Sequence, residues 1–247
     1  MKFGNERTQP SIDLVSRINI SDPERIIDIG CGPGNSTAIL RQRWPNARIT
    51  GLDNSPEMIS AAQQSCPFHE WILADAAKWQ APTPHRIVFS NAALQWMPDH
   101  ARLIPRLFGM VAKGGALAFQ IPARLYSPLH QHLLEVADEA EWAQRMAGPK
   151  NGFLMERPTF YYDLLAGAAS KIDLWETEYY HIMENHRAII SWASGTVLRP
   201  FLDALDTEDQ RQRFTQLLTV RVERVYQAQR DGKVLFPFRR LFMVAYA

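Results

Sequence analysis

The chain has 247 residues, of which 46% are hydrophobic and 21% are charged. This length and composition suit one globular domain with a sizeable core. The formal net charge of +1 gives no long-range field that would draw the chain to nucleic acid or to a membrane surface. Two cysteines, Cys31 and Cys66, are too few for a disulfide framework or a cysteine metal site.

The N-terminal residues lack the apolar core of a signal peptide, and no stretch of the sequence is long enough to span a bilayer. The seven histidines show no spacing typical of a metal site. We therefore expect a cytoplasmic protein without a bound metal. The sequence specifies no oligomeric state.

In chain order, the first predicted element is an amphipathic helix over residues 10–20, where apolar side chains recur at helical spacing. A β-branched run over residues 25–29 then predicts a buried strand. A helix over residues 35–44 follows, which Pro45 ends, and residues 48–52 are predicted to form the second strand.

The junction between the first strand and the following helix carries Asp28 and three glycines, Gly30, Gly32 and Gly34. Glycines directly after a strand allow a tight turn and let the backbone come close to a ligand. The N-terminus of the next helix offers free N–H groups. This pattern predicts a nucleotide-type cradle; the alternative is a glycine-rich turn without a ligand.

Two common phosphate-binding patterns do not fit this junction. The dinucleotide fingerprint G-x-G-x-x-G would need a glycine at Asn35, and Pro33 removes an N–H that a pyrophosphate would use. A P-loop requires Gly-Lys-Ser/Thr, which does not follow. The spacing instead resembles the first motif of class I S-adenosylmethionine-dependent methyltransferases, and this resemblance implies S-adenosylmethionine as the cofactor.

Asp53 ends the second strand, where such a fold places an acidic residue against ribose. The physical reason is that a carboxylate can accept hydrogen bonds from both hydroxyls of a diol. The alternative is helix capping, because Pro56 follows in the first turn of a helix. We favour ribose binding, with Asn54 beside it. Met58 either packs on the adenine face or fills the core.

Two further strand ends carry candidate cofactor-binding residues. A strand over residues 71–73 leads to Asp75 and Ala76, which suit an adenine pocket because a carboxylate can accept from the exocyclic amine. A strand over residues 86–90 leads to Asn91, which can line a methyl-donor channel. Trp96 either walls this channel or belongs to the core.

A helix over residues 101–111, a terminating turn at residues 113–115 and a strand over residues 116–121 come next. Strands and helices have then alternated five times. Such alternation predicts an α/β fold with a parallel sheet and ligand sites at the carboxyl edge of that sheet.

The second half of the chain changes character, because long helical patterns outnumber strands. Its predicted elements are helices over residues 127–146, 159–169 and 185–229, and strands over residues 172–180 and 241–246. Gly195 and Pro200 interrupt the last helical stretch.

The charge of the chain is uneven. Residues 185–247 contain ten Lys and Arg against six Asp and Glu, a net charge of +4, whereas the rest of the chain carries a net charge of −3. We therefore expect an anionic partner to bind near the C-terminal quarter.

Further stretches make the resemblance more specific, since they are similar to trans-aconitate 2-methyltransferases along nearly the whole chain. These stretches cover residues 30–37, 95–100, 192–196, 198–202, 231–233 and 238–242.

The resemblance implies a Rossmann-like, doubly wound and mostly parallel seven-stranded sheet with an antiparallel last strand. A helical lid would be inserted before that strand. The expected organisation is a methyltransferase core over residues 1–184, a lid over 185–238 and the last core strand over 239–247, in a single compact domain overall.

The resemblance also implies methyl transfer from S-adenosylmethionine to a carboxylate of trans-aconitate, a small polycarboxylate. A carboxylate is already ionised at pH 7, so this displacement needs no general base, and we predict no catalytic residue. Arginine offers bidentate donors to carboxylates. The predicted substrate-binding residues are Arg199, Arg239, Arg240, Trp96 and Arg7.

Neighbours on a strand face opposite ways, so we expect one of Arg239 and Arg240 to point inward. Two other functions stay open: a methyltransferase for another small acceptor, and a donor-binding protein without turnover. A nicotinamide dehydrogenase is the weakest option, because Asn35 stands where its third glycine belongs.

Overall fold

The computed structural model describes residues 4–67, 69–123, 127–152 and 154–247, with residues 4–7 described by their backbone. The chain divides into two compact units. The sheet unit comprises Met1–Pro122, Leu154–Thr177 and Arg240–Ala247, and the helical unit comprises Ala123–Phe153 and Glu178–Arg239. Each unit is described by itself below.

Within the described residues the sheet has seven strands in the order β3-β2-β1-β4-β5-β7-β6. The strands are β1 (Arg25–Ile29), β2 (Arg48–Asp53), β3 (Glu70–Leu73), β4 (His85–Asn91), β5 (Val111–Pro122), β6 (Lys171–Met183) and β7 (Val234–Tyr246). The pairs β1–β2, β1–β4, β2–β3 and β4–β5 are parallel, whereas β7 runs antiparallel to β5. The predicted doubly wound α/β sheet with an antiparallel last strand is confirmed.

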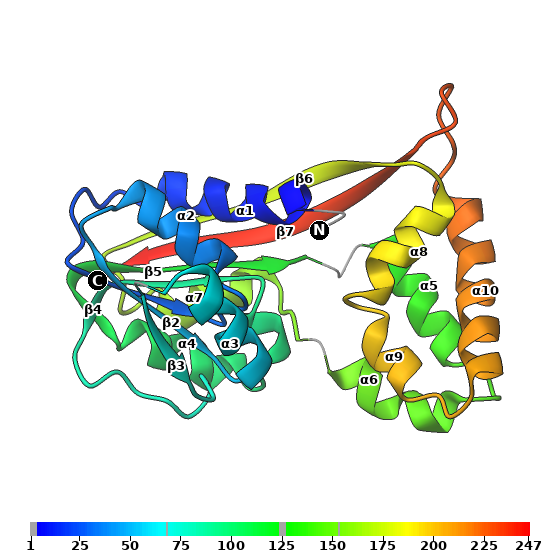
Figure 1. The fold of residues 1–247 in the computed structure, drawn as a ribbon, viewed down its shortest axis with the longest axis horizontal. Helices are drawn as coiled ribbons and strands as arrows, with labels where there is room; N and C mark the ends of the chain where they lie inside the picture. Colours follow the sequence, from blue (N-terminus) through cyan, green and yellow to red (C-terminus); the bar gives the residue numbers. More distant parts are fainter. Residues whose placement is uncertain (1–3, 68, 124–126, 153) are drawn as a thin grey trace. The chain divides into compact units, whose positions relative to one another are not determined.

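Helices cover both faces of this sheet. They are α1 (Gly4–Arg17), α2 (Asn35–Arg43), α3 (Pro56–Ser65), the 3₁₀ turn η1 (Leu94–Trp96), α4 (His100–Phe108) and α7 (Pro158–Leu165). Helices α1 and α2 pack together on one side of the sheet, and α4 packs with α7 on the other side (Figure 1). The central strand β1 is therefore covered on both faces, which explains its continuous apolar run and the full burial of Ile26, Ile27 and Ile29.

The turn predicted at residues 113–115 is wrong, because these residues lie inside β5. The register between β4 and β5 shifts between His85 and Ile87, which marks an irregularity opposite this stretch. A Cβ at Gly115 would stand 2.4 Å from the carbonyl oxygen of Arg86. The glycine thus permits a close approach of two strands rather than a turn.

Strand β7 begins at Val234, earlier than the predicted start at residue 241. Proline is tolerated in a strand where no partner needs its missing N–H. The pairing of β7 with β5 reaches Arg240, opposite Pro122, so Pro237 lies beyond the part of β7 that pairs with β5. Strand β7 thus contains Pro237 at a position that does not face β5.

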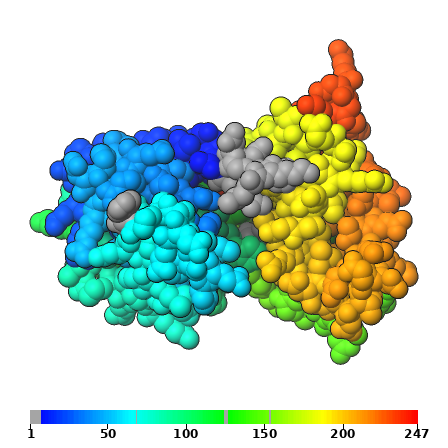
Figure 2. Space-filling view, in the orientation of Figure 1, coloured from blue at the N-terminus to red at the C-terminus, as the bar shows by residue number. Residues whose placement is uncertain are grey.

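The helical unit contains α5 (Pro128–Ala137), η3 (Ala143–Met146), α6 (Ala147–Asn151), α8 (His186–Ser194), α9 (Arg199–Asp203) and α10 (Glu208–Val225). Helix α10 packs against α5 and α8, and the surface of α8 to α10 appears in yellow and orange in Figure 2. The helix predicted over residues 127–146 breaks at Ala137. The Trp142 indole N–H donates to the Val136 carbonyl at 2.6 Å, which satisfies one carbonyl that the helix end leaves free.

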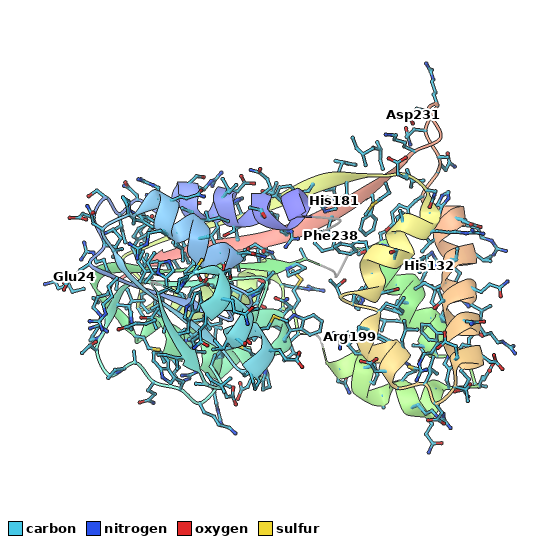
Figure 3. The ribbon with its side chains drawn as sticks, in the orientation of Figure 1. Glu24, His132, His181, Arg199, Asp231 and Phe238 are labelled. Carbon is cyan, nitrogen blue, oxygen red and sulfur yellow. The ribbon has the colours of Figure 1, made fainter. Side chains whose placement is uncertain are left out.

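The ends of β6 and β7 that belong to the helical unit carry an aromatic cluster. His181 and Phe238 lie side by side, with ring centroids 5.8 Å apart (Figure 3). Trp192 of α8 packs on Phe238 at 4.8 Å and on Phe236 at 5.4 Å. These contacts fix α8 to the two strands.

The helical unit is larger than the predicted insertion over residues 185–238, because Ala123–Phe153 and residues 178–184 also belong to it. Among the residues that the structure describes, no helix combines the length and the apolar character needed to cross a membrane.

Candidate functional site

A cavity of about 660 Å³ opens at the carboxyl ends of β1, β2, β3 and β4, and all of its lining residues belong to the sheet unit. This edge is where open parallel sheets bind ligands. The lining residues are Gly30, Gly32, Leu52, Asp53, Asn54, Ala74, Asp75, Ala76, Ala77, Lys78, Ala92, Ala93, Trp96, Met97 and Pro98.

The glycine loop between β1 and α2 forms one wall of the cavity. Gly30, Gly32 and Gly34 all have positive φ, which side chains other than glycine rarely adopt. A Cβ at Gly30 would stand 2.2 Å from the Cβ of Ala93, whereas a Cβ at Gly32 would meet no atom within 4 Å. Gly30 therefore lets two walls of the cavity touch. At Gly32 the absence of a side chain leaves the backbone exposed to the interior of the cavity.

Asp28 lies below this loop and not in the cavity lining. Its side chain is fully buried, and its Oδ2 accepts hydrogen bonds from Ser36 Oγ at 2.6 Å and Thr37 Oγ1 at 2.7 Å. Burial raises the pKa of Asp28 to about 6, although these two hydrogen bonds act in the opposite direction. Asp28 thus ties β1 to the first turn of α2.

Asp53 ends β2 and faces the cavity. Its Oδ2 accepts from the Gly32 N–H at 2.9 Å, and its Oδ1 accepts from the Ser55 N–H at 2.9 Å. Each carboxylate oxygen has a second lone pair, so both oxygens can still accept from a ligand. The helix-capping role weighed for Asp53 belongs to Ser55, whose side chain accepts from the Met58 N–H at the start of α3.

The loop after β3 forms the next wall. Asp75 is exposed, and its Oδ1 accepts from the Ala77 N–H at 2.9 Å, which fixes the turn. Arg106 of α4 donates to the carbonyls of Trp79, at 2.5 Å, and of Ala76. The loop that holds Asp75 and Ala76 is therefore anchored from a helix some thirty residues later in the chain.

The third wall consists of residues 92–98, between β4 and α4. Trp96 is 44% exposed and lines the cavity, so the alternative that it belongs to the core is wrong. Met97 and Pro98 line the cavity too, although neither was among the predicted site residues. Their position follows from η1, which turns the chain back towards the glycine loop.

The predicted cofactor-binding residues therefore fall into two groups. Those that line the cavity are Gly30, Gly32, Asp53, Asn54, Asp75 and Ala76. Those that lie outside its lining are Asp28, Gly34, Met58 and Asn91. Met58 is 40% exposed at the start of α3. Lys78 is an added lining residue, and its Nζ lies 3.8 Å from Asp75 Oδ2.

The predicted substrate-binding arginines occupy different surroundings. Arg240 of β7 is 5% exposed and its Nη1 donates to Gln120 Oε1 at 3.1 Å, so it is the inward-facing member of its pair. Arg239 belongs to the helical unit and pairs with Glu178 at 3.4 Å. Arg199, also in the helical unit, pairs with Asp203 one turn along the chain, with 74% of its side chain exposed. The side chain of Arg7 lies outside the described residues.

Comparison with known proteins agrees with this arrangement. A family model described as a methyltransferase domain matches residues 26–115, the stretch that supplies β1, the glycine loop and all three cavity walls. Among solved structures, the YcgJ protein from Bacillus subtilis superposes with a TM-score of 0.63 at 11% sequence identity, covering 96% of this chain and 98% of that chain. A phosphoethanolamine N-methyltransferase from Haemonchus contortus in complex with S-adenosylhomocysteine superposes with a TM-score of 0.60 at 12% identity, covering 96% of this chain and 52% of that chain. At these identities the likeness concerns the fold.

Curated relatives match over the full length. A trans-aconitate 2-methyltransferase from Methylobacterium radiotolerans is 44% identical over 248 residues, covering 99% of this chain and 95% of its own. Trans-aconitate 2-methyltransferases from Azoarcus and from Escherichia coli are each 42% identical over 245 residues, covering 99% of this chain and 96% and 95% of their own length. The chain belongs to the trans-aconitate 2-methyltransferase family.

Proposed function

We propose that this protein transfers a methyl group from S-adenosylmethionine to a carboxylate of trans-aconitate and releases the monomethyl ester. The observation that carries the proposal is the 41–44% identity to curated trans-aconitate 2-methyltransferases over 99% of the chain. The cytoplasmic location stays a prediction.

The cavity of the sheet unit fits the donor. Its volume of about 660 Å³ lies within the range usual for small-molecule sites. Gly32 leaves the backbone open to a ligand, and Asp53 keeps acceptor capacity for a ribose diol. Asp75 and the Ala76 backbone lie at the next strand end, where the adenine is expected.

When bound, S-adenosylmethionine supplies a methyl group on a positively charged sulfur. The residues of the chain hold and orient the two reactants, because an ionised carboxylate needs no proton removed before it attacks. No general base is therefore required, and the absence of a catalytic residue stays a prediction. Trp96 stands at the cavity wall, where it can limit the space around the reacting groups.

Arg240 is the arginine that we favour for the acceptor. It lies at the carboxyl end of the sheet, opposite Pro122 of β5, and its guanidinium can form bidentate hydrogen bonds with a carboxylate. Gln120 accepts from one of its nitrogens and so orients the group. Arg199, Arg239 and Arg7 stay predicted contacts, and the role of the helical unit as a lid stays a prediction.

The function is tested with isotopically labelled S-adenosylmethionine against trans-aconitate, cis-aconitate, isocitrate and citrate. Turnover that is fastest with trans-aconitate is the expected result. Turnover that is fastest with a different acid would support methyltransferase activity but contradict trans-aconitate as the acceptor. Donor binding without transfer to any of the four would contradict the proposal and favour the alternative of a donor-binding protein.

The acceptor site is tested by Arg240→Gln, with Arg213→Gln as a matched control. Arg213 is an exposed arginine of α10 that pairs with Glu141. Loss of a charged hydrogen bond to the acceptor is expected to raise KM for trans-aconitate roughly tenfold or more in the Arg240 variant. The KM for the donor should change little in either variant. Equal acceptor KM values for both variants would exclude Arg240 from the acceptor site.

A further inference from the structure

The cavity wall formed by residues 92–98 is bounded by strained backbone. Ala92 has φ 53° and Asp99 has φ 55°, and these are the described residues other than glycine with positive φ. Such a conformation is unfavourable by about 1–2 kcal/mol for each residue and persists only where the surroundings hold it. The contacts that hold this wall are therefore part of the site.

His100, the first residue of α4, makes one of these contacts. Its ring is 4% exposed, and its Nε2 lies 2.8 Å from the carbonyl oxygen of Leu94, within the wall. A carbonyl oxygen can only accept, so Nε2 carries the proton in this bond. The imidazole of His100 thereby ties the turn η1 to the helix that follows it.

The other ring nitrogen faces the Tyr161 hydroxyl. His100 Nδ1 lies 2.8 Å from the Tyr161 hydroxyl, and in the tautomer that carries its proton on Nε2 this nitrogen accepts from that hydroxyl. The same hydroxyl oxygen accepts from the Glu156 N–H at 3.1 Å. Each hydrogen bond in the series from Glu156 through Tyr161 and His100 to Leu94 therefore has one donor and one acceptor.

The Tyr161 end of this series of hydrogen bonds is firmly placed. Tyr161 of α7 is fully buried and packs on Phe119 of β5, with ring centroids 5.6 Å apart. A second link runs from the same region, since the Leu154 N–H donates to the Gln95 carbonyl at 2.8 Å. The segment that leads into α7 therefore supports the wall from outside the cavity.

At the Leu94 end of these hydrogen bonds the backbone has little freedom, because the neighbouring Ala93 already packs closely against Gly30 of the glycine loop. A Cβ at Gly30 would stand only 2.2 Å from the Ala93 Cβ. Without the His100 bond the Leu94 carbonyl would keep the Met97 N–H as a donor, at 2.9 Å, but would lose its link to the helix that follows, close to Gly30 and Trp96. Both of these residues line the cavity.

We propose that His100 is a positioning residue for donor binding: its Nε2–H holds the Leu94 carbonyl, and the Tyr161 hydroxyl contacts the other nitrogen of the ring. The inference rests on the proposed function in one respect, namely that the cavity takes the methyl donor. His100 does not line the cavity and acts through the backbone of residues 92–98.

Two substitutions at His100 separate its two hydrogen bonds. The amide nitrogen of glutamine lies close to the position of ring Nε2, so His100→Gln keeps a donor for the Leu94 carbonyl. The amide oxygen of asparagine lies close to the position of Nδ1, so His100→Asn keeps an acceptor for Tyr161 and loses the bond to Leu94. Tyr161→Phe removes the hydroxyl and keeps the bond to Leu94.

The measurement is the Kd of S-adenosylhomocysteine by calorimetry, together with the Tm of each variant. All three variants are expected to lose stability. His100→Asn should weaken binding about tenfold or more, whereas His100→Gln and Tyr161→Phe should stay within about threefold of wild type. At saturating donor, the KM for trans-aconitate should be unchanged in all three.

A purely structural role for His100 predicts a different pattern, in which affinity follows Tm regardless of which bond is lost. That result, or equal affinity in the Asn and Gln variants, would overturn the inference. Failure of the wild-type protein to bind S-adenosylhomocysteine would instead contradict the proposed function, so the two failures are distinguishable.

Discussion

Asp28 lies fully buried below the glycine loop, where Ser36 and Thr37 donate to one of its carboxylate oxygens. Both donors belong to the first turn of α2, whose N-terminus favours a nearby negative charge. Burial outweighs these effects and raises the pKa of Asp28 to about 6. The carboxylate therefore orders the cradle at a cost in stability at neutral pH.

Asp28→Asn tests this balance through pH. The native pKa of about 6 exceeds the ordinary value of 3.8, so Asp28 contributes most to stability below about pH 4 and loses that contribution as the pH rises through about 6. The variant lacks this titration. Relative to wild type, its free energy of unfolding should therefore rise with pH, by on the order of 2 kcal/mol between pH 4 and pH 7.5.

Urea denaturation across that pH range measures the difference. Burial also lowers the pKa of His85 to about 4, but this group is present in both proteins and cancels in the comparison. A difference between variant and wild type that stays constant with pH would show that Asp28 does not titrate in the native protein in this range.

Gly30 and Gly32 form a matched pair within the cradle. Alanine at either position adopts a positive φ, which is unfavourable by about 1 kcal/mol. Gly30→Ala also drives a Cβ into Ala93, whereas Gly32→Ala meets no protein atom. We expect Gly30→Ala to lower Tm by clearly more than Gly32→Ala. Because Gly32 lines the cavity, Gly32→Ala should weaken S-adenosylhomocysteine binding about tenfold or more with a small loss of Tm.

Thermal melts measure the loss of stability, and calorimetric titration measures the loss of affinity for S-adenosylhomocysteine. If Gly32→Ala binds S-adenosylhomocysteine as tightly as wild type, then the ligand does not approach the backbone at this glycine.

At the scale of the elements, the sequence is sufficient to predict which residues at strand ends come together in the cavity. The alternation of strands and helices brings Gly30, Asp53 and Asp75 to one edge of the sheet, and the structure places all three in the lining of one cavity. Periodicity and strand-end position were sufficient for this, because parallel strands share a common carboxyl edge.

The support of the third wall could not be predicted in this way. His100 and Tyr161 are 61 residues apart, and their hydrogen bond depends on how α4 packs against α7. Local pattern carries no information about such a contact. For the same reason Gly115 was interpreted as part of a turn, although its role is to let β5 approach the backbone of Arg86.

The packing of α1 on the far strands of the sheet gives a prediction about stability alone. The Trp175 ring of β6 stacks on Phe242 of β7 at 4.8 Å, and the Arg17 guanidinium of α1 lies 4.2 Å from the ring centroid of Trp175. Trp175→Ala removes both contacts and should lower the free energy of unfolding by about 2–4 kcal/mol.

Arg17→Ala is the matched control, because it removes only the exposed cation and its ion pair with Asp173. This change should be unfavourable by less than about 1 kcal/mol. Neither residue lines the cavity, so the Kd of S-adenosylhomocysteine should stay within about twofold of wild type in both variants. A similar stability for the two variants in urea would mean that the stacked ring does not hold α1, β6 and β7 together.

At the scale of the molecule, the structure changes the charge argument. Residues 185–247 carry a net charge of +4, but the helical unit also includes residues 123–153 and 178–184. With these, the helical unit has twelve Lys and Arg and twelve Asp and Glu, so its net charge is zero. Arg221 pairs with Glu139 at 2.7 Å, and Arg213 pairs with Glu141 at 3.3 Å. The support for an anionic acceptor therefore comes from the family and from particular arginines, not from a charged surface.

Ligand binding should stabilise the protein as a whole by mass action, because the cavity exists in the folded sheet unit. S-adenosylhomocysteine at 100 times its Kd should add about 2.7 kcal/mol to the stability of the unit that binds it. For a protein of this size that corresponds to a rise in Tm of roughly 5–10 °C. Differential scanning calorimetry measures the shift. If the two units melt in separate transitions, only the one belonging to the sheet unit should move, since the lining residues all lie there. Gly32→Ala at the same ligand concentration is expected to show a smaller shift, because mass action depends on the ratio of ligand to Kd. An equal shift in both proteins would place the ligand away from Gly32, and a shift confined to the transition of the helical unit would place its site outside the cavity.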